Sequence, residues 1–223
     1  MEQELFYEFC PKRGRQNNKA ILFSSGLGAV KDVIGVKKTF KHFDLDFHYF
    51  DRNDMLIAER FGGVRVLFDA FCEFIQKIDE KGYDELILFG KSFGGFLQLL
   101  AMQEIAIENI KTQIKIVCAP AFIDPSQLVE EGNIILPDGK TSIKIDETNE
   151  LFFVDHVVQK VSHDTLLLIG ENDNAQDLNG LKEFEEQNKE NVTLKVMKEA
   201  DHFNLLNRME SVYQIMKCLE IYK

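Results

Sequence analysis

Short apolar runs alternate with segments of helical periodicity along most of this 223-residue chain. In several of the short runs, 20–23, 86–89 and 166–169, the apolar residues are continuous, as they are in strands whose two faces are both buried. Strands that alternate with helices predict a mostly parallel sheet flanked by helices, the α/β class. The expected strands are 19–24, 46–50, 85–89, 114–119, 165–169 and 192–197, and the expected helices are 61–81, 96–107, 181–187 and 204–222.

The segment 121–162 departs from this alternation. Two apolar runs within it flank the tripeptide Pro137–Gly139, a turn sequence in which proline fixes φ, aspartate bonds its own backbone and glycine takes a positive φ. We therefore expect a small β-hairpin cap inserted over the carboxyl-terminal edge of the sheet. Because the chain has no internal repeat and no low-complexity linker, residues 1–223 are expected to form a single domain.

The acidic composition argues against polyanionic partners. Lys and Arg total 26 against 37 Asp and Glu, a formal net charge of −11. Such a surface repels phosphate backbones and anionic lipids, so neither nucleic acid nor a membrane is expected as a partner. No apolar run approaches the roughly 18 residues of a membrane span. Charged residues interrupt the start of the chain where a secretory signal would be apolar, which favours a cytoplasmic protein.

The cysteines are widely spaced and form no C-x-x-C pair and no metal-ligand spacing with histidine. We expect structural thiols and no metal site. The sequence also lacks the glycine-rich phosphate-binding patterns of nucleotide-binding proteins, so no cofactor is expected. The four cysteines are Cys10, Cys72, Cys118 and Cys218.

The pentapeptide Gly90–Gly94 matches the pattern G-x-S-x-G between an expected strand and an expected helix. A nucleophilic hydroxyl that projects above a sheet must sit on a very tight, strained turn. The residues two before and two after it then come too close for side chains, and glycine meets that demand. The helix that follows directs its N-terminal N–H groups towards developing negative charge. The pattern therefore indicates a nucleophile elbow centred on Ser92.

With this elbow and two later segments, the sequence resembles the α/β-hydrolase family over most of the chain. Residues 166–173 look like the family's strand-Gly-x-x-Asp segment, and residues 198–203 look like its strand-loop-His segment. The resemblance implies the α/β-hydrolase fold and a catalytic triad in the order nucleophile, acid, base. The matching residues are Ser92, Asp173 and His202.

Departures from the family pattern leave the acid open. Asp173 is not followed by the family's usual apolar and proline signature, which makes Asp177 a rival. Some relatives carry the acid after the strand that precedes the cap, which makes Asp124 a second rival. His202 is preceded by Asp201 rather than the frequent glycine, a change expected to alter the loop and to add a carboxylate near the base.

The resemblance also implies an oxyanion hole of two backbone N–H groups. One belongs to the residue after the nucleophile, Phe93. The other comes from the loop after the first strand, where Leu27 is the best match. Many relatives have His-Gly in that loop where this chain has Ser24–Gly26, so its register stays open.

Three further residues are candidates for contact with a substrate. Phe122 and Phe152 flank the cap and could line an acyl or alcohol pocket, or pack beneath the cap without contacting substrate. Lys91, beside the serine, is expected to be a solvated elbow residue, with attraction of an anionic substrate as the alternative.

These observations predict a serine hydrolase that cleaves a small-molecule carboxylic ester or thioester through an acyl-enzyme on Ser92. The small cap favours short or medium acyl groups. A lyase, an acyltransferase or a cofactor-free enzyme on the same scaffold stays open as an alternative, because a fold alone does not define a function. So does a non-catalytic binding protein that keeps the fold. Periodicity does not fix an oligomeric state.

Overall fold

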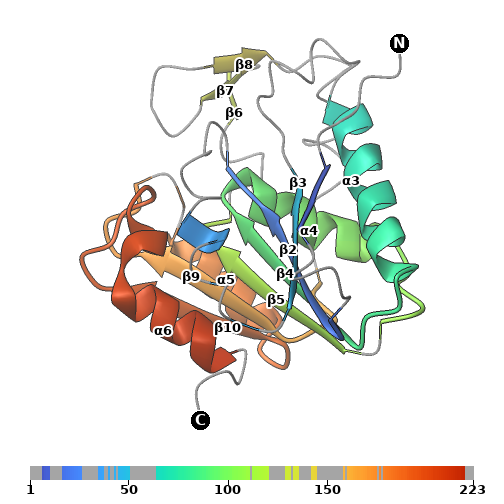
Figure 1. The fold of residues 1–223 in the computed structure, drawn as a ribbon. Helices are drawn as coiled ribbons and strands as arrows, with labels where there is room; N and C mark the ends of the chain where they lie inside the picture. Colours follow the sequence, from blue (N-terminus) through green and yellow to red (C-terminus); the bar gives the residue numbers. More distant parts are fainter. Residues whose placement is uncertain are drawn as a thin grey trace.

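The computed structural model describes residues 7–10, 17–26, 35–37, 40, 43, 45–50, 64–110, 112–120, 129–131, 133–135, 142–144, 158, 160–174, 176 and 178–218. Its main sheet has the strand order β1-β3-β2-β4-β5-β9-β10 (Figure 1). The strands are β1 (Tyr7–Cys10), β2 (Lys19–Ser24), β3 (Asp46–Phe50), β4 (Glu85–Lys91), β5 (Thr112–Cys118), β9 (Thr165–Gly170) and β10 (Val192–Met197).

The pairing of these strands is parallel from β3 to β10, which confirms the predicted mostly parallel sheet. Only β1 among them runs the other way. It pairs antiparallel with β3, with Tyr7 opposite Phe50, at the edge of the sheet. No expected strand covers this short segment.

The described helices include α3 (Val64–Asp79), α4 (Phe93–Glu104), α5 (Leu178–Gln187) and α6 (Met209–Cys218), with a 3₁₀ turn, η4 (Leu205–Asn207), before α6. The prediction of one continuous last helix over 204–222 is wrong at its start. Arg208 is extended, with ψ 133°, and separates η4 from α6. The side chain of Leu205 is buried in the same core as Ile215 of α6. The short turn η4 therefore packs against the sheet before α6 begins.

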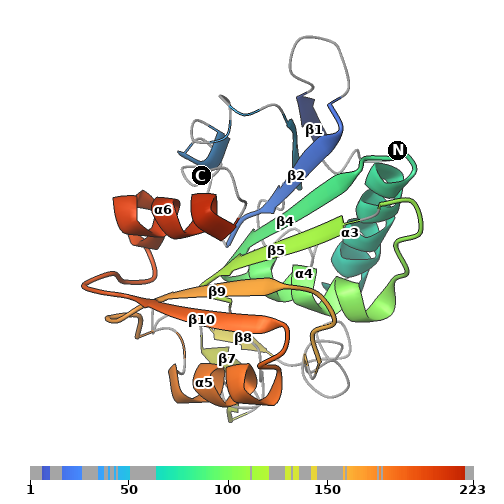
Figure 2. The same cartoon turned by 90° about the horizontal axis from the view of Figure 1, so that it is seen from below.

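Each face of the main sheet carries its own core. Successive side chains of a strand point to opposite faces. Leu22 and Leu88 therefore pack with α3, α4 and α5 on one face. Phe23 and Phe89 pack with Ile215 of α6 on the other face. Figure 2 shows α6 on the opposite side of the sheet from α3, α4 and α5.

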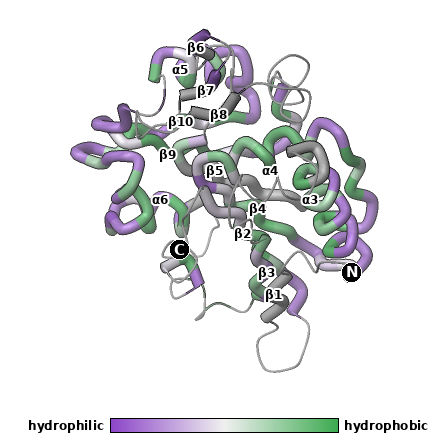
Figure 3. Tube along the Cα trace, turned by 90° about the horizontal axis from the view of Figure 1, so that it is seen from above, coloured by the Kyte–Doolittle hydropathy of each residue, from purple (hydrophilic) through white to green (hydrophobic). Residues whose placement is uncertain are grey.

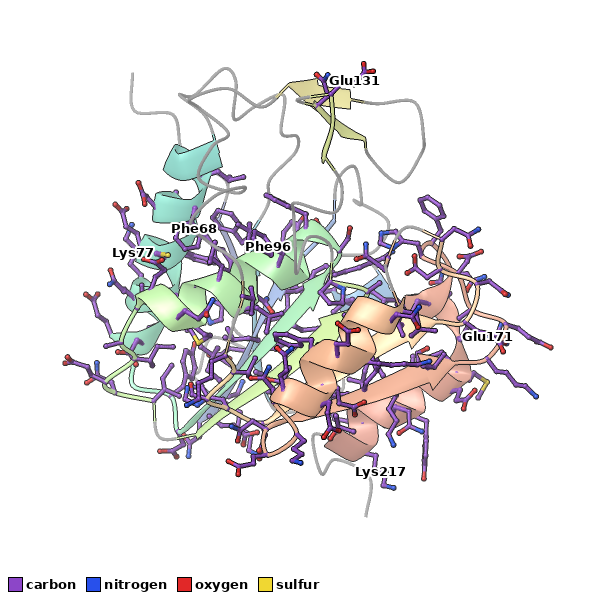
Figure 4. All side chains as sticks on the ribbon, turned by 180° about the vertical axis from the view of Figure 1, so that it is seen from behind. Phe68, Lys77, Phe96, Glu131, Glu171 and Lys217 are labelled. Carbon is purple, nitrogen blue, oxygen red and sulfur yellow. The ribbon has the colours of Figure 1, made fainter. Side chains whose placement is uncertain are left out.

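Helix α4 lies in the centre of the first core. Every residue from Phe93 to Ala101 is buried, and the helix is apolar on all sides, as an enclosed helix must be. Figure 3 shows its apolar course, and Figure 4 shows Phe96 beside Phe68 of α3 in the interior. Lys77 and Lys217 project outwards. Within the described residues, no helix combines the length and the apolar character needed to cross a bilayer.

A second, small sheet forms within the segment predicted to be a cap. Its antiparallel strands are β6 (Val129–Glu130), β7 (Asn133–Ile135) and β8 (Ser142–Lys144). The pairing of β7 with β8 confirms the expected hairpin, and β6 adds a strand to it. The turn Pro137–Gly139 lies outside the described residues. The small sheet stands apart from the main sheet in Figure 1.

Candidate active site

Ser92 lies where β4 ends and α4 begins. Its backbone has φ 54° and ψ −128°, a conformation that residues with a side chain rarely adopt. Its carbonyl oxygen accepts hydrogen bonds from the N–H groups of Gly95 at 2.9 Å and Phe96 at 3.2 Å. The first turn of α4 therefore closes directly on the serine, and this is why the helix begins before the expected residue 96. The tight turn places Ser92 at the carboxyl end of the middle strand of the sheet.

Close backbone approaches require both glycines of the pentapeptide. A Cβ on Gly90 would lie 2.5 Å from the Cα of Gly95. A Cβ on Gly94 would collide with the backbone oxygen of Ser24. The hydroxyl of Ser24 also donates to the carbonyl oxygen of Gly94 at 2.9 Å, which ties β2 to the start of α4. The steric reason given for the G-x-S-x-G spacing is thus confirmed.

Ser92, His202 and Asp173 form one hydrogen-bonded chain. His202 Nε2 lies 3.1 Å from Ser92 Oγ, and His202 Nδ1 lies 3.0 Å from Asp173 Oδ2. An ionised carboxylate only accepts, so Nδ1 carries the ring proton and Nε2 accepts from the serine hydroxyl. The side chain of Asp173 is fully buried and that of His202 is 10% exposed. The structure brings together the three residues that the sequence selected.

The loops after β9 and β10 hold the acid and the base next to each other. These two strands are parallel neighbours, so both loops leave the same edge of the sheet. The N–H of Asn172 donates to the carbonyl oxygen of Ala200 at 2.8 Å. This bond joins the residue before Asp173 to the loop of His202, and it fixes the spacing of the pair.

Asp201 shapes the loop that carries His202. Its Oδ1 accepts from the N–H groups of Phe203 at 2.8 Å and Asn204 at 2.7 Å. In return, Asn204 Oδ1 accepts from the N–H of Asp201 at 3.1 Å. This reciprocal arrangement resembles a helix capping box. Asp201, which stands where the resembled family often has glycine, therefore acts locally, by holding the turn around the histidine.

Two backbone segments border Ser92 where an oxyanion would form. Phe93 is the first residue of α4, at the positive end of the helix dipole. Gly26 passes beside the serine, because a Cβ there would lie 2.9 Å from Ser92 Cβ and 3.4 Å from Ser92 Oγ. The described chain after β2 thus ends next to Ser92. Leu27, the expected second donor, lies outside the described residues and stays a prediction.

Several other expected residues also lie outside the described part of the chain. They are Phe122, Phe152, Asp124 and Asp177. Lys91, in contrast, is described and contradicts its expectation. It is 5% exposed, so it is not a solvated elbow residue. As the last residue of β4 it follows the strand into the interior beside the site.

Phe203, which directly follows His202, is not among the residues expected at the site from the sequence. Its ring centroid lies 5.6 Å from that of His202, with the two planes at 84°. The side chain is 71% exposed. A large apolar residue in a loop, next to an expected catalytic histidine, was the available signal.

No cluster of three or more His, Cys, Asp or Glu that could hold a metal ion occurs in the part of the chain that the structure describes. Among the described residues, the side chains hydrogen-bonded in sequence at Ser92 are a hydroxyl, an imidazole and a carboxylate, and backbone amides lie beside them. Such a set can move a proton between Ser92 and His202 and can stabilise a negative oxygen.

Comparisons with known proteins show what the chain resembles. No family model and no curated protein sequence matches it. A putative hydrolase from Agrobacterium vitis S4 has a TM-score of 0.69 at 15% identity, over 93% of this chain and 90% of that one. Est1E from Butyrivibrio proteoclasticus has a TM-score of 0.67 at 17% identity, over 96% and 93%. The propionate-bound esterase Est2 from Thermogutta terrifontis has a TM-score of 0.65 at 15% identity, over 96% and 86%. The likeness spans nearly the whole of each chain and shows a shared fold.

Proposed function

We propose that this chain, which has the α/β-hydrolase fold expected from its sequence, is a serine hydrolase that cleaves a carboxylic ester or thioester. The observation that carries the proposal is the continuous hydrogen-bonded chain from Asp173 through His202 to Ser92. It ends on a serine held at a positive φ, directly before a helix N-terminus. A buried carboxylate, an imidazole and a hydroxyl in this order are the parts that nucleophilic acyl transfer needs.

In the first half of the reaction, Ser92 Oγ attacks the carbonyl carbon of the substrate. Its proton passes to Nε2 of His202, and the imidazolium is stabilised by Asp173 through the Nδ1–H bond. The carbonyl oxygen becomes an oxyanion, which accepts from the N–H groups of Phe93 and Leu27. Collapse of this intermediate breaks the bond to the leaving alcohol or thiol, which takes the proton from Nε2. The acyl group stays on Ser92.

In the second half, water replaces the leaving group. His202 removes a proton from the water as it attacks the acyl-enzyme, and then returns that proton to Ser92 Oγ. The products are a carboxylic acid and a free hydroxyl on the enzyme. Both halves use only groups that the chain itself supplies, so the proposal needs no cofactor. The names of two of the compared proteins, a putative hydrolase and an esterase, support the reaction class.

The first test is covalent labelling of the purified protein with a fluorophosphonate, followed by peptide mapping. We expect one adduct, on Ser92, which Ser92→Ala abolishes and His202→Ala suppresses. Asp173→Asn should slow labelling strongly, because an amide that donates to Nδ1 favours the wrong ring tautomer. Ser162→Ala and His163→Ala are matched controls, since the exposed Ser162 and the partly exposed His163 belong to the loop before β9.

Hydrolysis of short-chain esters and thioesters completes the test. Loss of Ser92 or His202 should reduce kcat by about 10⁴ to 10⁶. Turnover that survives Ser92→Ala would contradict the acyl-enzyme and favour chemistry that uses His202 alone. A folded wild-type protein that neither labels nor hydrolyses any activated ester would contradict the enzyme proposal altogether.

A further inference from the structure

Phe203 is a large aromatic side chain placed at the candidate active site and largely open to solvent. It is 71% exposed, and its ring meets the ring of His202 edge to face, at 5.6 Å between centroids. Exposed apolar residues are common on protein surfaces and need no explanation when they are scattered. This one differs because it touches the proposed catalytic base.

The backbone of Phe203 is fixed in this position. Its N–H donates to Oδ1 of Asp201 at 2.8 Å, within the turn that also positions His202. The ring is therefore carried by the same rigid turn as the base. A side chain whose backbone is held in this way loses less freedom when a ligand packs on it, and so favours binding.

The ring lies on the outer side of His202. The Nδ1 edge of the imidazole faces Asp173, whose side chain is fully buried. A ring that is 71% exposed cannot share that buried side. It lies instead towards the solvent, in contact with the imidazole.

The chemistry of the proposed reaction identifies which part of a substrate arrives there. His202 Nε2 must give its proton to the leaving oxygen or sulfur, so that atom comes within about 3 Å of Nε2. The group attached to it then extends outwards past the imidazole. Aromatic rings pair at centroid separations of about 4.5–7 Å, a distance that a ring attached to the leaving atom can span. The acyl group lies on the other side of the scissile bond, attached to Ser92.

We propose that Phe203 forms the leaving-group subsite and selects esters or thioesters whose alcohol or thiol carries an apolar ring. The inference rests on the proposed serine hydrolase and names the substrate class of that same site. Phe203 acts by contact with the leaving group, and the choice of acyl group is made elsewhere.

The test compares benzyl acetate with ethyl acetate, which share the acyl group and differ in the alcohol. Phe203→Ala should lower kcat/KM for benzyl acetate about tenfold more than for ethyl acetate, the size expected for one lost apolar contact in a binding site. The loss should fall mainly on KM, because ring contact stabilises bound substrate and transition state alike. Phe203→Leu should lie between Phe203→Ala and wild type. Tyr213→Ala, which removes another exposed aromatic ring from α6, should leave the benzyl-to-ethyl ratio unchanged.

Two further results separate the inference from the function on which it rests. If wild type hydrolyses both esters and Phe203→Ala lowers both kcat/KM values equally, Phe203 only supports His202 and the subsite is disproved. An unchanged ratio with unchanged rates disproves it as well. If wild type hydrolyses neither ester and Ser92 takes no fluorophosphonate, the proposed function fails and the inference fails with it. A change in ratio between benzyl acetate and benzyl butanoate on Phe203→Ala would assign the ring to the acyl side and overturn the proposal.

Discussion

His202 receives a defined contact on each side, so small displacements of its neighbours matter. Asp173 holds one ring nitrogen, Ser92 meets the other, and Phe203 borders the ring. Ser92 depends in turn on the loop after β2, because Gly26 lies against its side chain. Reacting groups must be aligned within a fraction of an ångström for efficient catalysis, and an error of about 1 Å can cost two orders of magnitude in rate.

Gly26→Ala should therefore impair activity more than stability. The added Cβ would lie 2.9 Å from Ser92 Cβ, so the serine or the loop must shift. We expect kcat/KM for a short ester to fall about 100-fold, and the free energy of unfolding to fall by about 1–3 kcal/mol. Ester kinetics and thermal unfolding measure the two effects.

Gly35→Ala is the matched control, because a Cβ on Gly35 would have no heavy atom within 4 Å. It should leave kcat/KM at the wild-type value. Equal activity in Gly26→Ala and Gly35→Ala would show that the loop can move away from Ser92 without cost, contrary to this prediction.

At the scale of elements, the sequence predicts strands better than it predicts where helices begin. The strand β10 has the expected bounds, because its apolar residues Val192, Leu194 and Val196 alternate with other side chains at the period of a strand. The edge strand β1 escapes prediction, since its pairing with β3 is set by tertiary contact rather than by a pattern. The start of α4 is misplaced because its first turn contains the glycines of the elbow, which in sequence resemble a loop.

In the candidate site, too, short sequence motifs could be identified, whereas features set by tertiary packing could not. Ser92, Asp173 and His202 could be selected because each stands in a short motif after a strand. The role of Asp201 could be predicted only in part: the sequence indicated an altered loop, but not that the carboxylate would bind the backbone of the turn. The burial of Lys91 could not be predicted either, because it depends on chain segments packed around the end of β4 rather than on neighbours in sequence.

The turn before η4, held by the carboxylate of Asp201, gives a prediction for stability and activity. Asp201→Ala removes the acceptor for the N–H groups of Phe203 and Asn204. Loss of a comparable cap costs about 1 kcal/mol of stability. We also expect kcat to fall about tenfold or more, since the turn aligns His202. Thermal unfolding and ester kinetics test both effects.

Asp201→Asn supplies the rescue, because its amide oxygen can accept the same two bonds. It should recover most of the stability and of kcat. If Asp201→Asn were as impaired as Asp201→Ala, the carboxylate charge rather than the turn would be the important property.

Across the whole molecule, two buried polar networks occupy opposite ends of the parallel strands. The candidate site lies at the carboxyl ends. At the amino ends, Tyr83 donates to Asp46 Oδ2 at 2.8 Å and lies 3.1 Å from His48 Nε2. Burial, the hydrogen bond to Asp46 and its charge raise the pKa of Tyr83, so the phenol keeps its proton and donates. Hence His48 Nε2 carries the hydrogen that points to the phenol oxygen.

His48 should make the fold sensitive to acid. Burial, assisted by the charge of Lys81 and opposed by that of Asp46, lowers its pKa from 6.5 to about 4. The folded state therefore binds fewer protons than the unfolded chain between these values. The stability that the neutral His48 contributes is complete above pH 6.5 and is lost as the pH falls towards 4. The free energy of unfolding falls by about 3 kcal/mol in total over this range. Urea unfolding of wild type from pH 8 to pH 4 measures the loss.

His48→Gln keeps a neutral donor without the titration. Its free energy of unfolding should be lower than that of wild type at pH 8, and should decline less steeply below pH 6.5. Parallel stability curves for the two proteins would assign the acid sensitivity to other groups.

The close approaches around Ser92 also bear on how such a chain can change over generations. Gly26, Gly90 and Gly94 each present only hydrogen where a neighbouring atom lies too near for carbon. Every amino-acid replacement of a glycine adds a side chain, so no mutation at these positions is neutral by size. The fold as a whole is shared with proteins of 15–17% identity. Mutational tolerance in this molecule should therefore be low even at residues that contribute no side chain to the chemistry.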